Sequence, residues 1–140
     1  MLKTRTSGVL LSLGSLPGTL GIGDLGNDAY RFVDELKNSN TKLWQILPLN
    51  PVGYGNSPYQ TYSAFAGDEI YISIEKLYEY LKLELDFEKV VSSSINYDQV
   101  RSTKQAYLKT AFDHFQANED YKSFLNDAFW LEEYVQFISL

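Results

Sequence analysis

The sequence predicts an α/β fold, in which a strand–helix–strand unit is followed by a mostly helical region. Two apolar runs, Gly8 to Leu13 and Leu43 to Leu49, flank a segment with helical periodicity and predict the first part. From about Glu75 onward the apolar residues recur at helical spacing, which predicts the second part. The chain has 140 residues, of which 44% are hydrophobic, and this is enough for one domain with a core.

Both apolar runs have the near-continuous pattern of parallel strands that are buried on both faces. A helix is predicted between them, from about Asn27 to residues 38–40. Its apolar residues recur at helical spacing: Ala29, Phe32, Val33 and Leu36. Such a crossover is right-handed, and the loops 14–26 and 50–67 then follow the carboxyl ends of the two strands. Barrel and open α/β folds place their sites there.

Three further elements are predicted after the second loop. Residues Glu69 to Ile74 alternate isoleucine with other residues, which predicts a third, half-exposed strand. Helices are predicted from about Tyr97 to Gln116 and from about Glu119 to Ile138. The last of these has apolar residues on two faces, so we expect a partner outside the chain to cover one of them.

Composition excludes several classes of function. The net charge is −6 and there is no dense basic cluster, which argues against nucleic acid or an anionic membrane as the main partner. The chain has no cysteine, so disulfides, thiolate metal sites and cysteine nucleophiles are excluded. The run Gly8 to Leu13 is too short for a signal peptide, and no run approaches the ~20 apolar residues of a membrane span. A cytoplasmic protein is the expectation.

The second loop has the composition of a site for a neutral, hydroxyl-rich ligand. It is crowded with glycine, proline and aromatic residues, and no charged residue lies between Gly53 and Gly67. A tyrosine can stack on a sugar ring and hydrogen-bond through its hydroxyl, which favours a binding role for Tyr54 and Tyr59. Filling the core beneath the loop is the alternative, and we expect it for Tyr62 and Phe65. Uncharged donors and acceptors are also present: Asn56, Ser57 and Gln60.

The carboxylates and the single histidine have structural interpretations. Asp24 lies just ahead of the predicted helix, where a cap or a first-turn charge is expected, although a site role near the strand end is the alternative. Asp68 and Glu69 are interpreted as a polar lead-in to the third strand. His114, within a predicted helix, is expected at the surface.

Three segments resemble the 4-alpha-glucanotransferases, the amylomaltase or disproportionating-enzyme family. LWQILPLNPVGYGNSPYQTYSAFAGDE, residues 43–69, resembles the corresponding segment of that family closely. SGVLLSLGSLPGTLGIGDLG, residues 7–26, is similar to its N-terminal pattern, and WLEEYVQF, residues 130–137, is a weaker third match. The three segments occur in the family's order.

The resemblance implies the N-terminal portion of a (β/α)8 TIM barrel, residues 1–74, followed by a mostly helical inserted subdomain, residues 75–140. It implies transfer of α-1,4-glucan segments between maltooligosaccharides by retaining double displacement, with no cofactor and no metal. Ser57, Tyr59 and Gln60 would line glucan subsites, and Tyr54 would make an accessory glucan contact. The family's catalytic carboxylates lie on later strands, so no catalytic residue is assigned in this chain.

Length sets a further expectation. A complete barrel needs about 250 residues, so we expect the chain to be a fragment whose partner is the remainder of the barrel, and to be inactive alone. A non-catalytic carbohydrate-binding or interaction module is the alternative interpretation.

Overall fold

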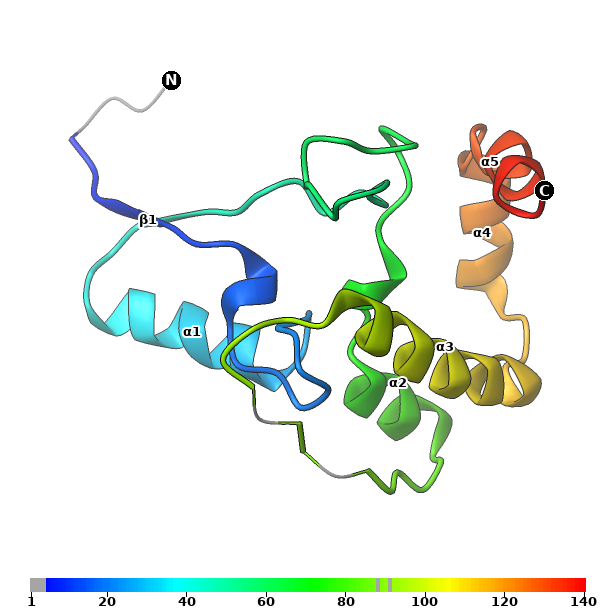
Figure 1. The fold of residues 1–140 in the computed structure, drawn as a ribbon, viewed down its shortest axis with the longest axis horizontal. Coiled ribbons are helices and arrows are strands. Elements are labelled where there is room, and N and C mark those ends of the chain that lie inside the picture. Colours follow the sequence, from blue (N-terminus) through cyan, green and yellow to red (C-terminus); the bar gives the residue numbers. More distant parts are fainter. Residues whose placement is uncertain (1–4, 88, 91) are drawn as a thin grey trace.

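The computed structural model describes residues 5–87, 89–90 and 92–140, and it has an α/β composition as predicted. Two short parallel strands and helix α1 lie at one side of the molecule, and helices α4 and α5 lie at the other (Figure 1). Helices α2 and α3 pack together between them. The elements follow one another in this order: β1 Gly8–Leu10, the 3-10 turn η1 Leu13–Ser15, α1 Asn27–Asn38, β2 Leu43–Gln45, the 3-10 turn η2 Glu69–Tyr71, α2 Ile74–Leu81, α3 Tyr97–His114, α4 Glu119–Asp127 and α5 Leu131–Ile138.

The predicted strand–helix–strand order is confirmed, and β1 pairs with β2 in parallel, with Val9 opposite Trp44. Both strands are shorter than predicted. After β1 the backbone turns at once into η1, where Ser15 N–H donates to the Ser12 carbonyl at 3.0 Å. After β2 the chain enters a segment with Pro48, which has no N–H to donate to a ladder.

The expectation that both strands are buried on both faces is wrong for this chain. Helix α1 covers one face only, where the Phe32 and Trp44 rings meet edge to face at 5.0 Å and the Trp44 indole donates to the Leu11 carbonyl at 2.8 Å. Leu10 is 61% exposed and Leu43 is 44% exposed. An apolar run predicts that a strand is buried, but it does not identify the element that packs against the strand.

The third strand predicted at Glu69 to Ile74 is wrong, because these residues form η2 and the start of α2. The Asp68 carboxylate accepts from the Ile70 N–H at 3.1 Å, and the Ser73 hydroxyl accepts from the Lys76 N–H at 3.4 Å. Such local bonds offer the backbone an alternative to a strand. Ile70 is buried in η2, and Ile74 is buried at the start of α2.

The helix predicted from Tyr97 to Gln116 is confirmed as α3, whereas the final helix is not continuous. It is divided into α4 and α5 by a turn at Ala128, whose ψ of 68° lies outside the helical region. The Leu131 N–H then donates to the Ala128 carbonyl at 2.9 Å as α5 begins. Neither α4 nor α5 has a buried residue, and Phe124, Leu125 and Val135 are exposed. A partner that covers these helices stays a prediction.

The described core consists of three hydrophobic clusters rather than one. The first joins Leu20 to α2 and α3, the second joins η1 to α1, and the third joins Ile22 to Ile70 and to Val100 of α3. Two of the clusters contain residues from both sides of position 74, and the division into 1–74 and 75–140 stays a prediction. Among the described residues, no helix is both long and apolar enough to cross a membrane.

Candidate functional site

The candidate site is built on loop 50–67, which leaves β2 and returns to η2. Its two ends are held together: the Asp68 N–H donates to the Leu49 carbonyl at 2.7 Å, and the Asn50 side-chain amide donates to the Ala66 carbonyl at 3.0 Å. Further along, Val52 and Thr61 form an antiparallel bridge. The loop therefore has a closed base and a defined tip.

The tip of this loop contains all four residues that the sequence predicts for sugar binding. The Gly53 N–H donates to the Gln60 carbonyl at 2.9 Å, and the Gln60 N–H donates to the Ser57 carbonyl at 3.0 Å. The turn needs a left-handed backbone at Gly55, where φ is +86°. The sequence pattern of turn formers is thus explained by one compact hairpin-like tip.

The two tyrosines favoured for binding are exposed. The Tyr54 side chain is 98% exposed and Tyr59 is 73% exposed, whereas Ser57 is half-buried and Gln60 is exposed. The turns on either side keep both rings out of the core. The arrangement presents two aromatic faces and uncharged polar groups to solvent.

Tyr62 and Phe65 were expected to fill the core, and this is wrong, because both are exposed. Their rings instead contact α5 and the turn before it. The centroid of the Tyr62 ring lies 6.0 Å from that of Phe137, and the centroid of the Phe65 ring lies 5.2 Å from that of Phe129 and 6.2 Å from that of Trp130. The loop lies against α5 and the turn before it, rather than over a packed interior. An open groove with a volume of about 420 Å³ runs between these aromatic side chains.

Asp24 is not a helix cap. The N-cap of α1 is Gly26, which makes no side-chain capping bond, and the Asp24 carboxylate instead accepts from the ammonium of Lys104 in α3 at 2.7 Å. Burial raises the pKa of Asp24, and the bond to Lys104 opposes this rise. Burial likewise lowers the pKa of Lys104, against the opposing effect of Asp24. The partner lies 80 positions away in the sequence, so no local pattern indicated it.

Asp68 and Glu69 are also not a lead-in to a strand. Asp68 is buried and caps η2, and both its carboxylate oxygens accept from Arg101 of α3, at 2.9 and 2.7 Å. Glu69 accepts from the same guanidinium at 2.9 Å. The bond to Asp68 raises the pKa of Arg101. Asp24 and Asp68 are thus each held in an ion pair with a basic side chain of α3.

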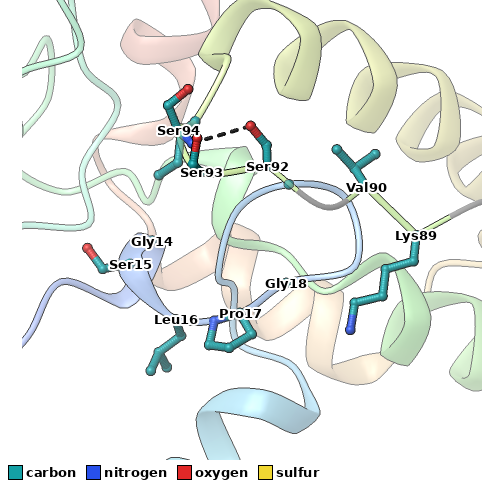
Figure 2. A pocket seen from close by; sticks show the side chains of 12 residues that line it. Gly14, Ser15, Leu16, Pro17, Gly18, Lys89, Val90, Ser92, Ser93 and Ser94 are labelled. Carbon is teal, nitrogen blue, oxygen red and sulfur yellow. Dashed lines mark hydrogen bonds between the residues drawn. The ribbon is translucent and has the colours of Figure 1, made fainter.

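A second hollow lies beside the first loop. It has a volume of about 630 Å³, and Figure 2 shows one wall from Gly14 to Gly18 and another from Lys89, Val90 and Ser92 to Ser94. The Val90 N–H donates to the Thr19 carbonyl at 2.9 Å, which ties the two walls together. The described side chains of this hollow include no carboxylate and several serine hydroxyls, among them Ser92 and Ser94. The first wall belongs to loop 14–26, which the sequence predicted.

Histidine and carboxylate side chains are the residues of this chain that could ligate a metal ion. Within the described ranges, no group of three or more histidine, aspartate or glutamate side chains could hold a metal ion. The expectation that no metal and no cofactor is needed stays an expectation. His114 is exposed, as predicted, and its Nδ1 lies 2.8 Å from the Thr110 carbonyl.

Known proteins match this chain over nearly its whole length. A family model described as 4-alpha-glucanotransferase matches residues 11–140. The 4-alpha-glucanotransferase of Aquifex aeolicus (strain VF5) is 41% identical over 140 residues, which cover 97% of this chain and 29% of the relative. The alignment with the enzyme of Thermus thermophilus is 143 residues long and shows 38% identity. It covers 97% of this chain and 29% of the relative.

The match extends to solved structures. The amylomaltase from Streptococcus agalactiae in complex with acarbose superposes with a TM-score of 0.77 at 36% sequence identity, and the match covers 94% of this chain and 28% of that one. The chain thus spans well under a third of the length of these relatives. Because the family model matches all but the first ten residues and the fold agrees with a solved amylomaltase, this chain belongs to the 4-alpha-glucanotransferase family.

Proposed function

We propose that this chain forms a glucan-binding wall of a 4-alpha-glucanotransferase, which transfers α-1,4-glucan segments between maltooligosaccharides. One observation supports this most directly: Tyr54 and Tyr59 are 98% and 73% exposed at the tip of a loop whose base is closed by hydrogen bonds. Exposed aromatic rings on a fixed backbone can stack on sugars at little cost in conformational entropy.

The polar residues of the tip suit the hydroxyl rim of a glucose ring. Ser57 and Gln60 lie beside Tyr59 in the turn and offer donors and acceptors without charge. The amylomaltase of similar fold is in complex with acarbose. We assign Ser57, Tyr59 and Gln60 to glucan subsites, and Tyr54 to an accessory contact.

We further propose that the isolated chain is not a catalyst. Retaining transfer needs a nucleophile and a general acid/base, two carboxylates ~5–5.5 Å apart. Asp24 and Asp68, the carboxylates nearest the two loops in sequence, are engaged by Lys104 and Arg101. Incubation of the purified chain with maltotriose should release no glucose and no longer oligomers. Turnover that persists in an independent preparation would contradict this.

In this proposal, β1, α1 and β2 are the start of a TIM barrel, and the helices after residue 74 are an inserted subdomain. The parallel order of β1 and β2 and the position of both loops after the carboxyl ends of these strands support it. The remainder of the barrel would then be the partner that covers the exposed face of the strands. A cytoplasmic location stays a prediction.

Glucan binding by the chain tests the proposal. Maltoheptaose is titrated into ¹⁵N-labelled chain, and amide shifts of residues 53–67 are followed by NMR, for the wild type and for Tyr59→Ala. We expect binding about tenfold weaker in the variant, equivalent to about 1.4 kcal/mol, with an unchanged melting temperature. Tyr30→Ala is the matched control, because Tyr30 is an exposed tyrosine on α1.

Three results would overturn the assignment. The first is equal affinity of Tyr59→Ala and the wild type. The second is equal loss of affinity in Tyr30→Ala. The third is a large fall in the melting temperature of Tyr59→Ala, which would identify a core residue rather than a sugar contact.

A further inference from the structure

Lys104 of α3 has an unusual environment for a lysine, because its side chain is 0% exposed. Its ammonium donates three hydrogen bonds: to the Asp24 carboxylate at 2.7 Å, to the Ile70 carbonyl at 2.6 Å and to the Ile72 carbonyl at 2.8 Å. A lysine ammonium has three donors, so all of them are used. One side chain therefore joins three segments that are far apart in sequence.

The segment that Lys104 holds is bonded at three successive carbonyls. Between the two that Lys104 binds, the Tyr71 carbonyl accepts from the N–H of Leu25, the neighbour of Asp24, at 3.0 Å. Residues 70–72 are thus tied to α3 and to the loop after β1 at once. Movement of this segment would break bonds to both.

These bonds continue to the base of loop 50–67. Asp68 accepts from Arg101, three positions before Lys104 on α3. The Asp68 N–H donates to the Leu49 carbonyl at 2.7 Å, and the adjoining Asn50 donates to the Ala66 carbonyl at 3.0 Å. A continuous set of bonds therefore runs from α3 through residues 68–72 to both ends of the loop that presents Tyr59.

Stability alone is a poor reason to bury this lysine. Removing an ammonium and a carboxylate from water is costly for each ion, and well-packed apolar side chains of similar volume often serve the fold equally well or better. The directions of the pKa changes at Asp24 and Lys104 agree, since burial disfavours the charged form of both. Three directed hydrogen bonds, in contrast, define the relative positions of their acceptors in a way that apolar packing does not.

We propose that Lys104 is a positioning residue, which acts through residues 70–72 and Asp24 to hold the base of loop 50–67 and thereby the sugar-binding tip. The part that concerns sugar rests on the proposed function, whereas the part that concerns the loop does not.

The test uses the full 140-residue chain with the pair replaced by apolar side chains, Asp24→Leu with Lys104→Met. Three quantities are measured: the free energy of unfolding in urea, the hydrogen exchange of single amides by NMR, and the affinity for maltoheptaose. We expect stability no lower than wild type, exchange at Leu25, Gly53 and Asp68 at least tenfold faster, and affinity about tenfold lower. The control, Glu119→Leu with Lys122→Met, replaces an exposed pair on α4 and should change neither exchange nor affinity.

Unchanged exchange at these amides in a folded double variant would overturn the proposal, whatever the glucan result. If wild-type chain does not bind maltoheptaose, the proposed function fails, and the exchange data still decide the role of Lys104. If the double variant does not fold, hydrogen exchange in the wild-type chain tests the proposal instead. The protection factors of the Leu25 and Asp68 amides should then lie within about tenfold of that of the Lys104 amide in α3. Protection there that is a hundredfold weaker would overturn the proposal.

Discussion

The guanidinium of Arg101 binds both carboxylate oxygens of Asp68, with Nη1–Oδ1 at 2.9 Å and Nη2–Oδ2 at 2.7 Å. The Asp68 side chain is 0% exposed, whereas that of Arg101 is 28% exposed. Two parallel, charge-assisted bonds fix direction as well as distance. This pair therefore attaches α3 to the residue that closes the base of loop 50–67.

Arg101→Ala should lower the free energy of unfolding by about 3 kcal/mol, because it leaves a buried carboxylate without its cation. Urea denaturation of the two proteins measures the difference. Arg31→Ala removes the cation of an exposed pair with Asp28 on α1 and should change stability by less than about 0.5 kcal/mol. Similar decreases in the free energy of unfolding in the two variants would show that the Arg101–Asp68 pair contributes no more to stability than an exposed pair.

The Asp24 carboxyl should make stability depend on pH in an unusual direction. Burial raises its pKa above the ordinary 3.8, so the folded chain holds this proton more tightly than the unfolded chain does. Its contribution to stability is then fully present below pH 3.8 and is lost as the pH rises through the folded-state pKa. The stability advantage of wild type over Asp24→Asn should accordingly be largest near pH 3 and decrease toward pH 7.

Chemical denaturation of both proteins at several pH values between 3 and 7 measures this advantage. An advantage that grows with pH would mean that the bond to Lys104 outweighs burial in setting the pKa of Asp24. Lys104→Met supplies a check at high pH. Since burial lowers the pKa of Lys104 below 10.5, the contribution of Lys104 should be present above pH 10.5 and lost as the pH falls through the folded-state pKa.

Gly18 should tolerate no side chain. A Cβ at this position would lie 1.7 Å from the Ile22 carbonyl oxygen, which belongs to the backbone and cannot rotate away. Gly18→Ala should therefore lower the free energy of unfolding by roughly 1–3 kcal/mol through displacement of loop 14–26. At Gly67 a Cβ would meet nothing within 4 Å, so Gly67→Ala should be neutral or slightly stabilising. Equal effects of the two substitutions on urea denaturation would contradict the close approach.

The C-terminal helices should promote self-association of the chain. Phe124, Phe129 and Phe137 are exposed on or beside α4 and α5, and apolar patches above a few hundred Å² are rare on soluble monomers. Sedimentation velocity at several concentrations should show a concentration-dependent mass, and Phe129→Ser with Phe137→Ser should reduce it. Tyr54→Ser, at an exposed residue of loop 50–67, is the control.

A single monomeric species at all concentrations would contradict this prediction. Quenching of Trp130 fluorescence, measured in a Trp44→Phe background, is a second test of self-association. Dilution should increase quenching if association shields Trp130. Quenching that is independent of concentration would show that the chain shields this ring by itself.

The sequence by itself determined the elements whose signals are local. The spacing of apolar residues located α1 and α3, and the two apolar runs located the paired strands. The density of turn formers located the exposed loop with Tyr54 and Tyr59. Each of these signals is contained within a few residues, because it depends on backbone preference and on the period of a helix or a strand.

Only the tertiary structure decided where the carboxylates and the later aromatic rings lie. Asp24 and Lys104 are 80 positions apart, and the chain must fold before their pairing exists. The alternation at residues 69–74 predicted a strand, but capping bonds from Asp68 and Ser73 formed turns and a helix instead. Phe65 meets Phe129 and Trp130 rather than a core, since α5 lies beside the loop. Hydrophobic periodicity predicts that a side chain packs against another part of the protein. Which residue it contacts is determined by the packing of elements that are distant in sequence.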